Sequence, residues 1–231
     1  MPHTTSAAFA PATGSGLDSD RWWVRAARFI IGVFVLAGVA YSTSVAVIDR
    51  NDRGLVEQFS FFTIEANLVF GAVLVLSAVL PRQRLPRWWD HLRGALAFYL
   101  VMTGLVYALL VAPPGEVWSL NITWTNWALH RVAPLFAVAD WLLVVMTIRG
   151  RWMRPLVWLI YPLAFLIYSW IRGAITGWYP YDFLNPTLPG GWGAVLVTTL
   201  IVLIAFLIVS VIVHLLGNLR AGSPPPPGSH R

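Results

Sequence analysis

The sequence predicts an all-α, polytopic membrane protein with six transmembrane helices in one bundle. Hydrophobic residues make up 58% of its 231 residues and charged residues 11%, whereas an average globular domain has roughly 25% charged residues. Six apolar stretches approach the roughly 20 residues that a helix needs to cross a bilayer. They lack the alternation of polar and apolar side chains that marks a membrane β-strand. The six predicted spans are residues 23–48, 59–80, 92–111, 126–148, 156–174 and 194–216.

Two tails without a hydrophobic period flank the predicted membrane domain. Residues 1–20 are rich in Ala, Thr, Ser, Gly and Pro, a composition typical of a disordered segment. Residues 218–231 include a run of prolines, which is typical of a polyproline-like end. Residues 21–217 are therefore predicted to form a single six-helix transmembrane domain, with a disordered tail on either side.

The absence of two residue types excludes several chemistries. The chain has no cysteine, which excludes disulfides, thiolate metal sites and cysteine nucleophiles. It also has no lysine, so a retinal or pyridoxal Schiff base cannot form. A haem between His91 and His214 is an alternative, since a bis-histidine haem needs two histidines at matching depth. We expect neither a metal ion nor another cofactor.

The arginines are distributed unequally between the two predicted sides of the membrane. Arg50 and Arg53 are the two that fall in the loops of one side. The positive-inside rule places the arginine-rich side in the cytoplasm, so both termini of a multi-pass cell-membrane protein are predicted there. This topology explains the net charge of +6 without nucleic-acid binding. The arginines of the rich side are Arg21, Arg25, Arg28, Arg82, Arg84, Arg87, Arg93, Arg149, Arg151, Arg154, Arg220 and Arg231.

Five polar side chains are predicted at one depth in the outer half of the bilayer. An ionisable side chain inside a span is expensive and is therefore a candidate for function. Counting about 1.5 Å per residue from the outer end of each span brings groups from three helices to a common level. They are Thr63 and Glu65 of the second span, His130 and Arg131 of the fourth, and Arg172 of the fifth.

Spacing assigns the uncharged groups to helix faces. Thr63 and Asn67 are four residues apart and share a face, as do Asn126 and His130. Pro134 removes a backbone donor next to the histidine and is expected to bend the fourth span there. Structural hydrogen bonds are the alternative explanation, because a membrane threonine often bonds a carbonyl of its own helix and polar side chains often bond across helices.

The charged groups are expected to pair with one another. Glu65 points to a different face of its helix from the threonine, and its expected partner in a structural ion pair is Arg131 or Arg172. Asp140 lies about 15 Å deeper in the fourth span and is either a protonated core acid or the partner of another helix. Residues 177–192 are aromatic and Pro-rich, and we expect them to form a lid over the outer opening.

Five motifs lie in the second, fourth and fifth spans and in the loop after the fifth. Together they resemble the androgen-induced-protein-like family of membrane proteins, and most closely its bacterial six-helix branch. The other three spans match that family only in hydrophobicity. The chain departs from the bacterial pattern at Glu65 and Ala66, where Gln and Ser are more frequent. It also departs at Asn185, where an acid is more frequent than an amide. The motifs are FFTIEAN (61–67), His130 through Pro134 to Asp140 and Trp141, Tyr161 with Pro162, Tyr168 to Arg172 and Gly173, and WYPYDFLNP (178–186).

The resemblance implies an intramembrane hydrolase of lipid esters. Animal members of the family cleave fatty-acid esters of hydroxy fatty acids with a threonine nucleophile and a histidine partner, and the matching positions here are Thr63 and His130. The expected partners are membrane lipids and a lipid ester substrate. The alternative is a non-catalytic bundle that binds lipid or conducts a small solute, with a structural polar cluster. The sequence leaves the oligomeric state open.

The polar neighbours of this pair are expected to bind the substrate. Asn67 or Asn126 would donate a hydrogen bond to the oxyanion, and Arg131 or Arg172 would hold a fatty carboxylate at headgroup level. Tyr168 lies at the same depth and is expected to complete the substrate site.

The arginine distribution predicts that the C-terminus is cytoplasmic. A reporter enzyme that is active only outside the cytoplasm, fused after Arg231, should therefore give no signal, whereas the same reporter inserted after Arg53 should be active. A strong signal from the C-terminal fusion would contradict the predicted orientation.

Overall fold

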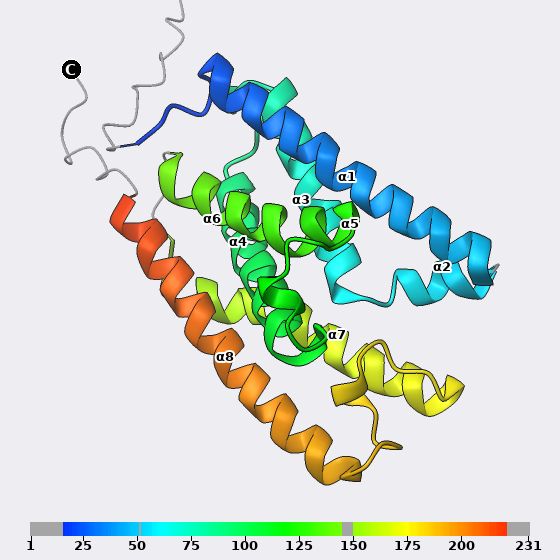
Figure 1. Cartoon of the computed structure of the whole chain (residues 1–231). Helices are drawn as coiled ribbons and strands as arrows, with labels where there is room; N and C mark the ends of the chain where they lie inside the picture. The colour runs from blue at the N-terminus through cyan, green and yellow to red at the C-terminus, as the bar shows by residue number, and fades with distance from the viewer. Residues whose placement is uncertain (1–15, 51, 145–149, 221–231) are drawn as a thin grey trace, which may run out of the picture.

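The computed structural model describes residues 16–50, 52–144 and 150–220, and within these residues the chain is helical, without a β-strand. Among these described residues, five helical segments are long and apolar enough to cross a membrane. They are α1 (Trp22–Arg50), α3 (Phe62–Val79), α4 (Trp89–Val106) with its continuation η2 (Tyr107–Val111), α7 (Arg154–Thr176) and α8 (Gly191–Arg220). The short helices α2 (Asp52–Gln58) and η1 (Arg82–Arg84) connect them. The predicted all-α polytopic bundle is confirmed (Figure 1).

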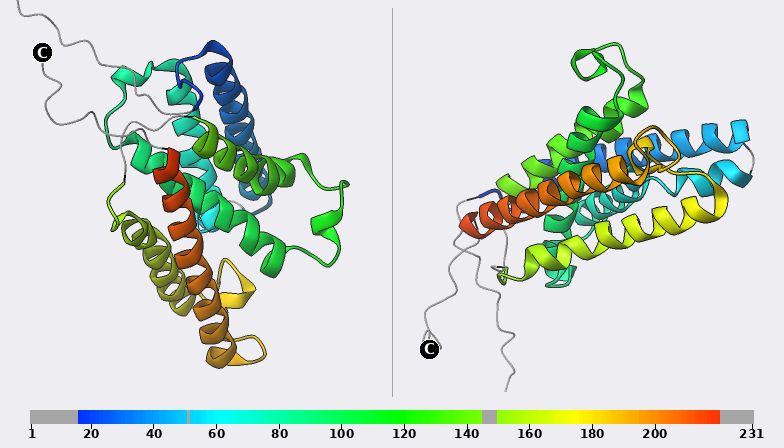
Figure 2. Two further views of the ribbon diagram at one scale, coloured as in Figure 1. Left: turned by 90° about the vertical axis from the view of Figure 1, so that its left-hand side faces the viewer. Right: turned by 90° about the horizontal axis from the view of Figure 1, so that it is seen from below.

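The predicted fourth span is not one regular helix. It consists of α5 (Trp124–Trp127), the π-helical turn η4 (Ala128–Val132) and α6 (Ala133–Leu143), which follow one another without a gap. The predicted end of this span at residue 148 lies outside the described residues. A loop that carries the short helix η3 (Glu116–Trp118) precedes α5 and projects from the bundle (Figure 2).

Close contact between α1 and α3 depends on two glycines. A methyl group added at Gly32 would lie 3.0 Å from the carbonyl oxygen of Gly71, and one at Gly71 would lie 2.7 Å from the side chain of Leu36. Helices in lipid associate mainly through close packing, because the surrounding hydrocarbon is as apolar as their side chains. The missing side chains therefore allow the two backbones to approach.

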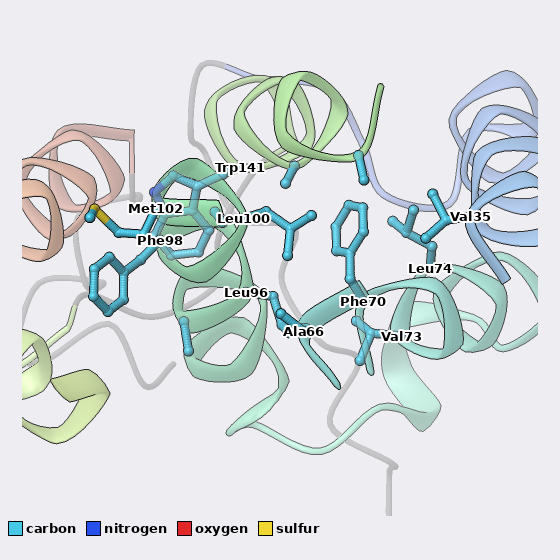
Figure 3. Packing of buried hydrophobic residues seen from close by; sticks show 14 of the residues in the cluster. Val35, Ala66, Phe70, Val73, Leu74, Leu96, Phe98, Leu100, Met102 and Trp141 are labelled. Atoms are coloured by element: carbon cyan, nitrogen blue, oxygen red, sulfur yellow. The ribbon is translucent and has the colours of Figure 1, made fainter. Parts of the chain in front are cut away.

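The core forms around α4, which packs against α3, α6 and α8. Phe98 and Leu100 of α4 are completely buried. Figure 3 shows Leu96 and Leu100 facing Ala66 and Phe70 of α3. These contacts hold α4 at the centre, where its second half can contribute to a cavity.

A buried ion cluster joins α1, α4 and α6. The carboxylate of Asp140 accepts hydrogen bonds from Arg28 at 2.7 Å and from Arg93 at 2.7 and 3.0 Å, and all three side chains are buried. Arg93 also bonds Asp90 at 3.1 Å, and Asp90 bonds Arg82 at 3.0 Å. Asp140 is thus the partner of other helices, which was one of the two roles expected for it.

The chain before α1 packs against this cluster. Ser19 is buried and accepts a hydrogen bond from Arg28 at 2.7 Å, while the carboxylate of Asp20 accepts one from the backbone N–H of Arg82 at 2.9 Å. The N–H of Leu17 donates to the carbonyl of Leu143 at 2.7 Å. The predicted tail boundary at residue 20 is therefore wrong for residues 16–20, and residues 1–15 lie outside the described part.

The end of α8 also extends into the predicted C-terminal tail. The side chain of Asn218 bonds both the N–H and the carbonyl of Gly150, at 2.8 and 3.2 Å. The helix continues to Arg220, so the predicted boundary at residue 218 is too early, and residues 221–231 lie outside the described part. Both views show the start of α1 and the end of α8 at the same end of the bundle (Figures 1 and 2), which we name the cluster end.

Removing the central carboxylate of the ion cluster should destabilise the fold. Asp140→Asn leaves two arginines buried beside an amide, and loss of one partner of a buried pair costs about 3–5 kcal/mol. We expect a clearly lower thermal unfolding midpoint in detergent than for Asp182→Asn, which changes an exposed carboxylate in the loop between α7 and α8. Equal midpoints for the two variants would show that the cluster contributes little to stability.

Candidate active site

A mostly apolar cavity of about 90 Å³ lies in the half of the bundle away from the cluster end. Its wall combines the start of α3, the end of α4 with η2, the turn η4, the middle of α7, the loop before α8 and α8 itself. Most lining side chains are hydrophobic. The polar ones are Thr63, Thr103, Tyr107, His130, Tyr181 and Thr199.

Thr63 and His130 line this same cavity from different helices. Thr63 lies in the first turn of α3 and His130 in η4, 67 residues later. Hydrogen bonds within the described residues do not join the two side chains, and the buried Nδ1 of His130 has no hydrogen-bond partner there. The imidazole instead stacks on Tyr107, with ring centroids 3.9 Å apart and an angle of 25° between the planes.

The π-helical turn around His130 leaves one backbone carbonyl without a partner in its own helix. The N–H of Ala133 bonds to the carbonyl of Ala128, five residues back. Pro134 has no N–H, so the carbonyl of Leu129 loses both its α-helical and its π-helical donor. Asn67 of α3 supplies the missing hydrogen bond, with a distance of 3.2 Å from its Nδ2 to this carbonyl.

Asn67 is completely buried and links the two parts of the candidate site. Its Nδ2 also donates to the backbone carbonyl of Thr63 at 2.8 Å. Because both hydrogens of the amide are used, the predicted role of Asn67 as an oxyanion donor is wrong. The side chain instead fixes the backbone of Thr63 relative to the residue that precedes His130.

A polar cluster beside Tyr107, the first residue of η2, contains a residue that the sequence did not point to. Glu116 of η3 accepts hydrogen bonds from the hydroxyl of Tyr107 and, at 2.7 Å, from Nδ2 of Asn126. The same Nδ2 also donates to the Tyr107 hydroxyl. The Asn126 amide is thus engaged, so the expected oxyanion role is not supported. In the sequence Glu116 is a single acid in a loop, and no pattern connects it with the histidine.

The predicted ion pair between Glu65 and an arginine is wrong in this structure. Glu65 accepts a hydrogen bond from the hydroxyl of Tyr161 on α7. The guanidinium of Arg131 lies 4.4 Å from the ring centre of Trp127, and that of Arg172 lies over another tryptophan. A phenol satisfies the carboxylate without the desolvation of a second charge, which is the main cost of a buried ion pair.

The two arginines have different partners at the cavity end of the bundle. Arg131 donates to the backbone carbonyls of Glu116 and Val117 at 2.9 and 3.3 Å, so it holds the η3 loop. Arg172 lies 4.2 Å from the ring centre of Trp178, and its buried Nη1 has no hydrogen-bond partner among the described residues. Arg172 therefore retains a donor for an anionic group, whereas Arg131 is partly engaged by the loop.

Tyr168 does not line the cavity. Its hydroxyl bonds the hydroxyl of Ser60 at 2.8 Å, and Ser60 donates to the carbonyl of Val56 at 2.7 Å. This contact ties α7 to the corner between α2 and α3. In this structure Tyr168 thus has a structural contact, and its substrate-binding role stays a prediction.

The loop expected to form a lid supplies one wall of the cavity. Tyr181, Phe183 and Leu184, the last two in η5 (Asp182–Leu184), line it. Phe61 contacts both Trp178 and Tyr181 edge-on, with ring centroids 5.6 Å apart in each case. Burial raises the pKa of the Tyr181 phenol, while hydrogen-bonding groups of Thr63 oppose this shift, which places the phenol beside the threonine.

The histidine pair considered for haem lies elsewhere. His91 and His214 each contact the buried ring of Trp158, with centroid distances of 5.8 and 6.4 Å. Both histidines thus pack against one indole, and neither lines the cavity that contains Thr63 and His130.

Comparisons with protein-family models, with curated proteins and with solved structures found no match. The resemblance seen in the motifs of α3, of α5 to α6, of α7 and of the loop after α7 therefore stays a prediction. The candidate site is defined by the shared cavity and by the contacts of its own residues.

Loss of the Asn67 amide should loosen the contact between α3 and η4. Asn67→Leu has a similar volume but leaves the Leu129 carbonyl without a donor, and an unsatisfied buried carbonyl costs about 1–3 kcal/mol. We expect a lower unfolding midpoint and faster amide exchange around residues 128–133. Asn121→Leu, in the loop before α5, serves as the control, and a midpoint equal to that control would contradict this role for Asn67.

Proposed function

We propose that the protein is an intramembrane hydrolase of lipid esters, with Thr63 as the nucleophile and His130 as the general base. The observation that carries the proposal is that these two side chains, from separate helices, share one largely apolar cavity. Its apolar lining suits the hydrocarbon of an acyl chain, and its few polar groups can orient an ester. Asn67 supports the pair by holding their two backbones together.

The reaction begins when His130 accepts the hydroxyl proton of Thr63 while the threonine oxygen attacks the ester carbonyl carbon. The tetrahedral intermediate collapses, the bond to the alcohol oxygen breaks, and the alcohol leaves with the proton from His130. Water then attacks the acyl-threonine and gives a proton to His130. The bond to the threonine oxygen breaks, His130 returns the proton to this oxygen, and the fatty acid leaves. The two side chains must approach each other when substrate binds, since catalytic hydrogen bonds often form only in the complex.

Two further groups are assigned to substrate within this proposal. Tyr181 lies beside Thr63 in the cavity wall and is a candidate hydrogen-bond donor to the oxyanion. Arg172 has a buried guanidinium nitrogen without a partner among the described residues, which suits a free fatty carboxylate. Both groups belong to the segment from the end of α7 to the loop that follows it.

The proposed orientation follows from the arginines. The cluster end of the bundle carries Arg25, which donates to the last carbonyls of α3 at Ala78 and Val79. Arg82 and Arg154 belong to the same end, at the turn before α4 and at the start of α7. Under the positive-inside rule this end faces the cytoplasm. The cavity then lies in the outer half of the cell membrane, close to the ester level of a lipid.

A non-catalytic lipid-binding bundle is the second candidate. One observation favours it: His130 is stacked on Tyr107 and is not bonded to Thr63. In such a protein the cavity would bind an amphiphile without covalent chemistry. The two candidates differ in whether the threonine oxygen becomes acylated.

Substitution of the proposed nucleophile and base should abolish ester cleavage. Purified protein is assayed with a panel of lipid esters and labelled with a fluorophosphonate probe, which reacts with activated hydroxyl nucleophiles. We expect Thr63→Ala and His130→Ala each to lose both signals, and the double variant to be no worse than either one, because the two residues act as a unit. Thr63→Ser should keep part of the activity.

Thr43→Ala is the matched control. Its buried hydroxyl has no hydrogen-bond partner among the described residues and lies along α1, outside the cavity. Full labelling of Thr63→Ala would remove the nucleophile assignment. Retained lipid binding in a wild-type protein without any cleavage would favour the non-catalytic bundle instead.

A further inference from the structure

The contacts of His130 indicate a third participant in the proposed site. A histidine that accepts a proton during a reaction becomes a cation, and hydrolases that use such a base usually stabilise it with a further group. In this structure the face of the imidazole is covered by the ring of Tyr107, at 3.9 Å between centroids. A cation within about 6 Å of a tyrosine ring is attracted to its negative face.

Tyr107 is itself held by an acid. Its hydroxyl donates to Oε1 of Glu116, and the amide of Asn126 donates to the same carboxylate oxygen at 2.7 Å. The backbone of Glu116 is fixed in turn, because Arg131 donates to its carbonyl at 2.9 Å.

Both stacked residues occur at irregular turns. Tyr107 begins the π-helical turn η2 and His130 lies in the π-helical turn η4. Single π-helical turns inside α-helices cost stability and occur frequently at functional sites. The phenol and the imidazole from these two turns both line the cavity and are in contact.

We infer that Glu116 is a positioning residue that acts on His130 through the ring of Tyr107 and stabilises the charged imidazole formed in the reaction. This inference rests on the proposed function. The order of the unit is Thr63, His130, Tyr107 and Glu116, in which the aromatic ring takes the place of a direct bond between the histidine and an acid.

The other ionisable groups near η4 are engaged elsewhere. Asp140 of α6 is paired with two arginines. On α3 the carboxylate of Glu65 bonds Tyr161. Arg131, on η4 itself, lies over Trp127. The tyrosines around η4 are Tyr41 of α1, which packs on Trp124, Tyr99 of α4, which donates to the Trp158 carbonyl, and Tyr181, which lines the cavity.

Four variants test this inference by their effect on ester hydrolysis as a function of pH. Glu116→Gln removes the charge, Tyr107→Phe keeps the stacked ring without the link, and Tyr107→Leu removes both. The fourth is the double variant of Tyr107→Leu with Glu116→Gln. We expect kcat to fall on the order of tenfold for Tyr107→Leu, from the strength of a desolvated cation–π contact. KM should stay within about twofold for Glu116→Gln and Tyr107→Phe, because Glu116 does not line the cavity and Tyr107→Phe keeps the ring in its wall.

The pH profile separates this role from a structural one. The acid limb of kcat/KM reports the protonation of the base in the free enzyme. Loss of the Glu116 charge, or of the Tyr107 hydroxyl that links this charge to the ring, disfavours the protonated imidazole. The limb should therefore move to lower pH in Glu116→Gln and in Tyr107→Phe. The double variant should match Tyr107→Leu, since the acid acts through the ring. Asp49→Asn and Tyr41→Phe, which change an exposed acid and an exposed tyrosine of α1, are the controls and should resemble wild type.

A second measurement does not depend on catalysis. In a Thr63→Ala background, the ring signal of isotope-labelled His130 is followed by NMR over pH and assigned with His130→Asn. Glu116→Gln should move the titration midpoint of this signal to lower pH. An unchanged midpoint in Glu116→Gln overturns the inference. If the wild type is active, variants that keep its kcat and its acid limb overturn it as well. A wild type that cleaves no ester removes the proposed function, while the NMR result still decides whether Glu116 stabilises the charged ring.

Discussion

The carbonyl of Leu129 has no hydrogen-bond donor in its own helix. The structure of the candidate site depends on which other residue supplies that hydrogen bond. In hydrocarbon an unsatisfied backbone group costs several kcal/mol, so irregular helices persist only where a neighbour supplies the missing bond. Asn67 supplies it here. The same amide holds the carbonyl of Thr63, and the two proposed catalytic turns are thereby joined through one side chain.

The polar side chains at the two ends of the bundle differ in how far they are paired. At the cluster end, carboxylates and arginines from α1, α4 and α6 pair with one another and exclude water. At the cavity end, polar side chains line a cavity, and the buried hydroxyls of Thr103 and Thr199 are without partners among the described residues. A satisfied polar network makes a bundle rigid, whereas unsatisfied groups around a cavity are typical of a site that binds something.

The sequence predicted well how deep each residue lies along its helix, and poorly toward which neighbour its side chain points. Five of the six spans end within a few residues of the helices observed, because length and hydrophobicity determine where a chain crosses a bilayer. Thr63 and His130 line one cavity, as their common depth suggested. Glu65 and Tyr168 share that depth but bond Tyr161 and Ser60. Rotation of a helix about its axis decides such pairs, and the rotation follows from packing that one sequence does not reveal.

Loop residues were the other failure of sequence reasoning. Glu116 accepts hydrogen bonds from Tyr107 and Asn126 only because the η3 loop folds back onto the start of η2. Residues 16–20 pack on the ion cluster although their composition resembles a disordered tail. In both segments a few specific hydrogen bonds determine the structure, and neither composition nor a periodic pattern predicts these bonds.

The ion cluster also constrains how the chain is made. Arg28 enters the membrane boundary with the first helix, and Arg93 follows with α4, but their shared carboxylate at Asp140 is synthesised 112 residues after the first arginine. During translation both cations must remain hydrated at the lipid surface or be shielded by the insertion machinery until α6 arrives. A ribosome stalled before Asp140 therefore holds a half-built bundle with two uncompensated charges, and the arrival of one aspartate is the step at which α1, α4 and α6 can close.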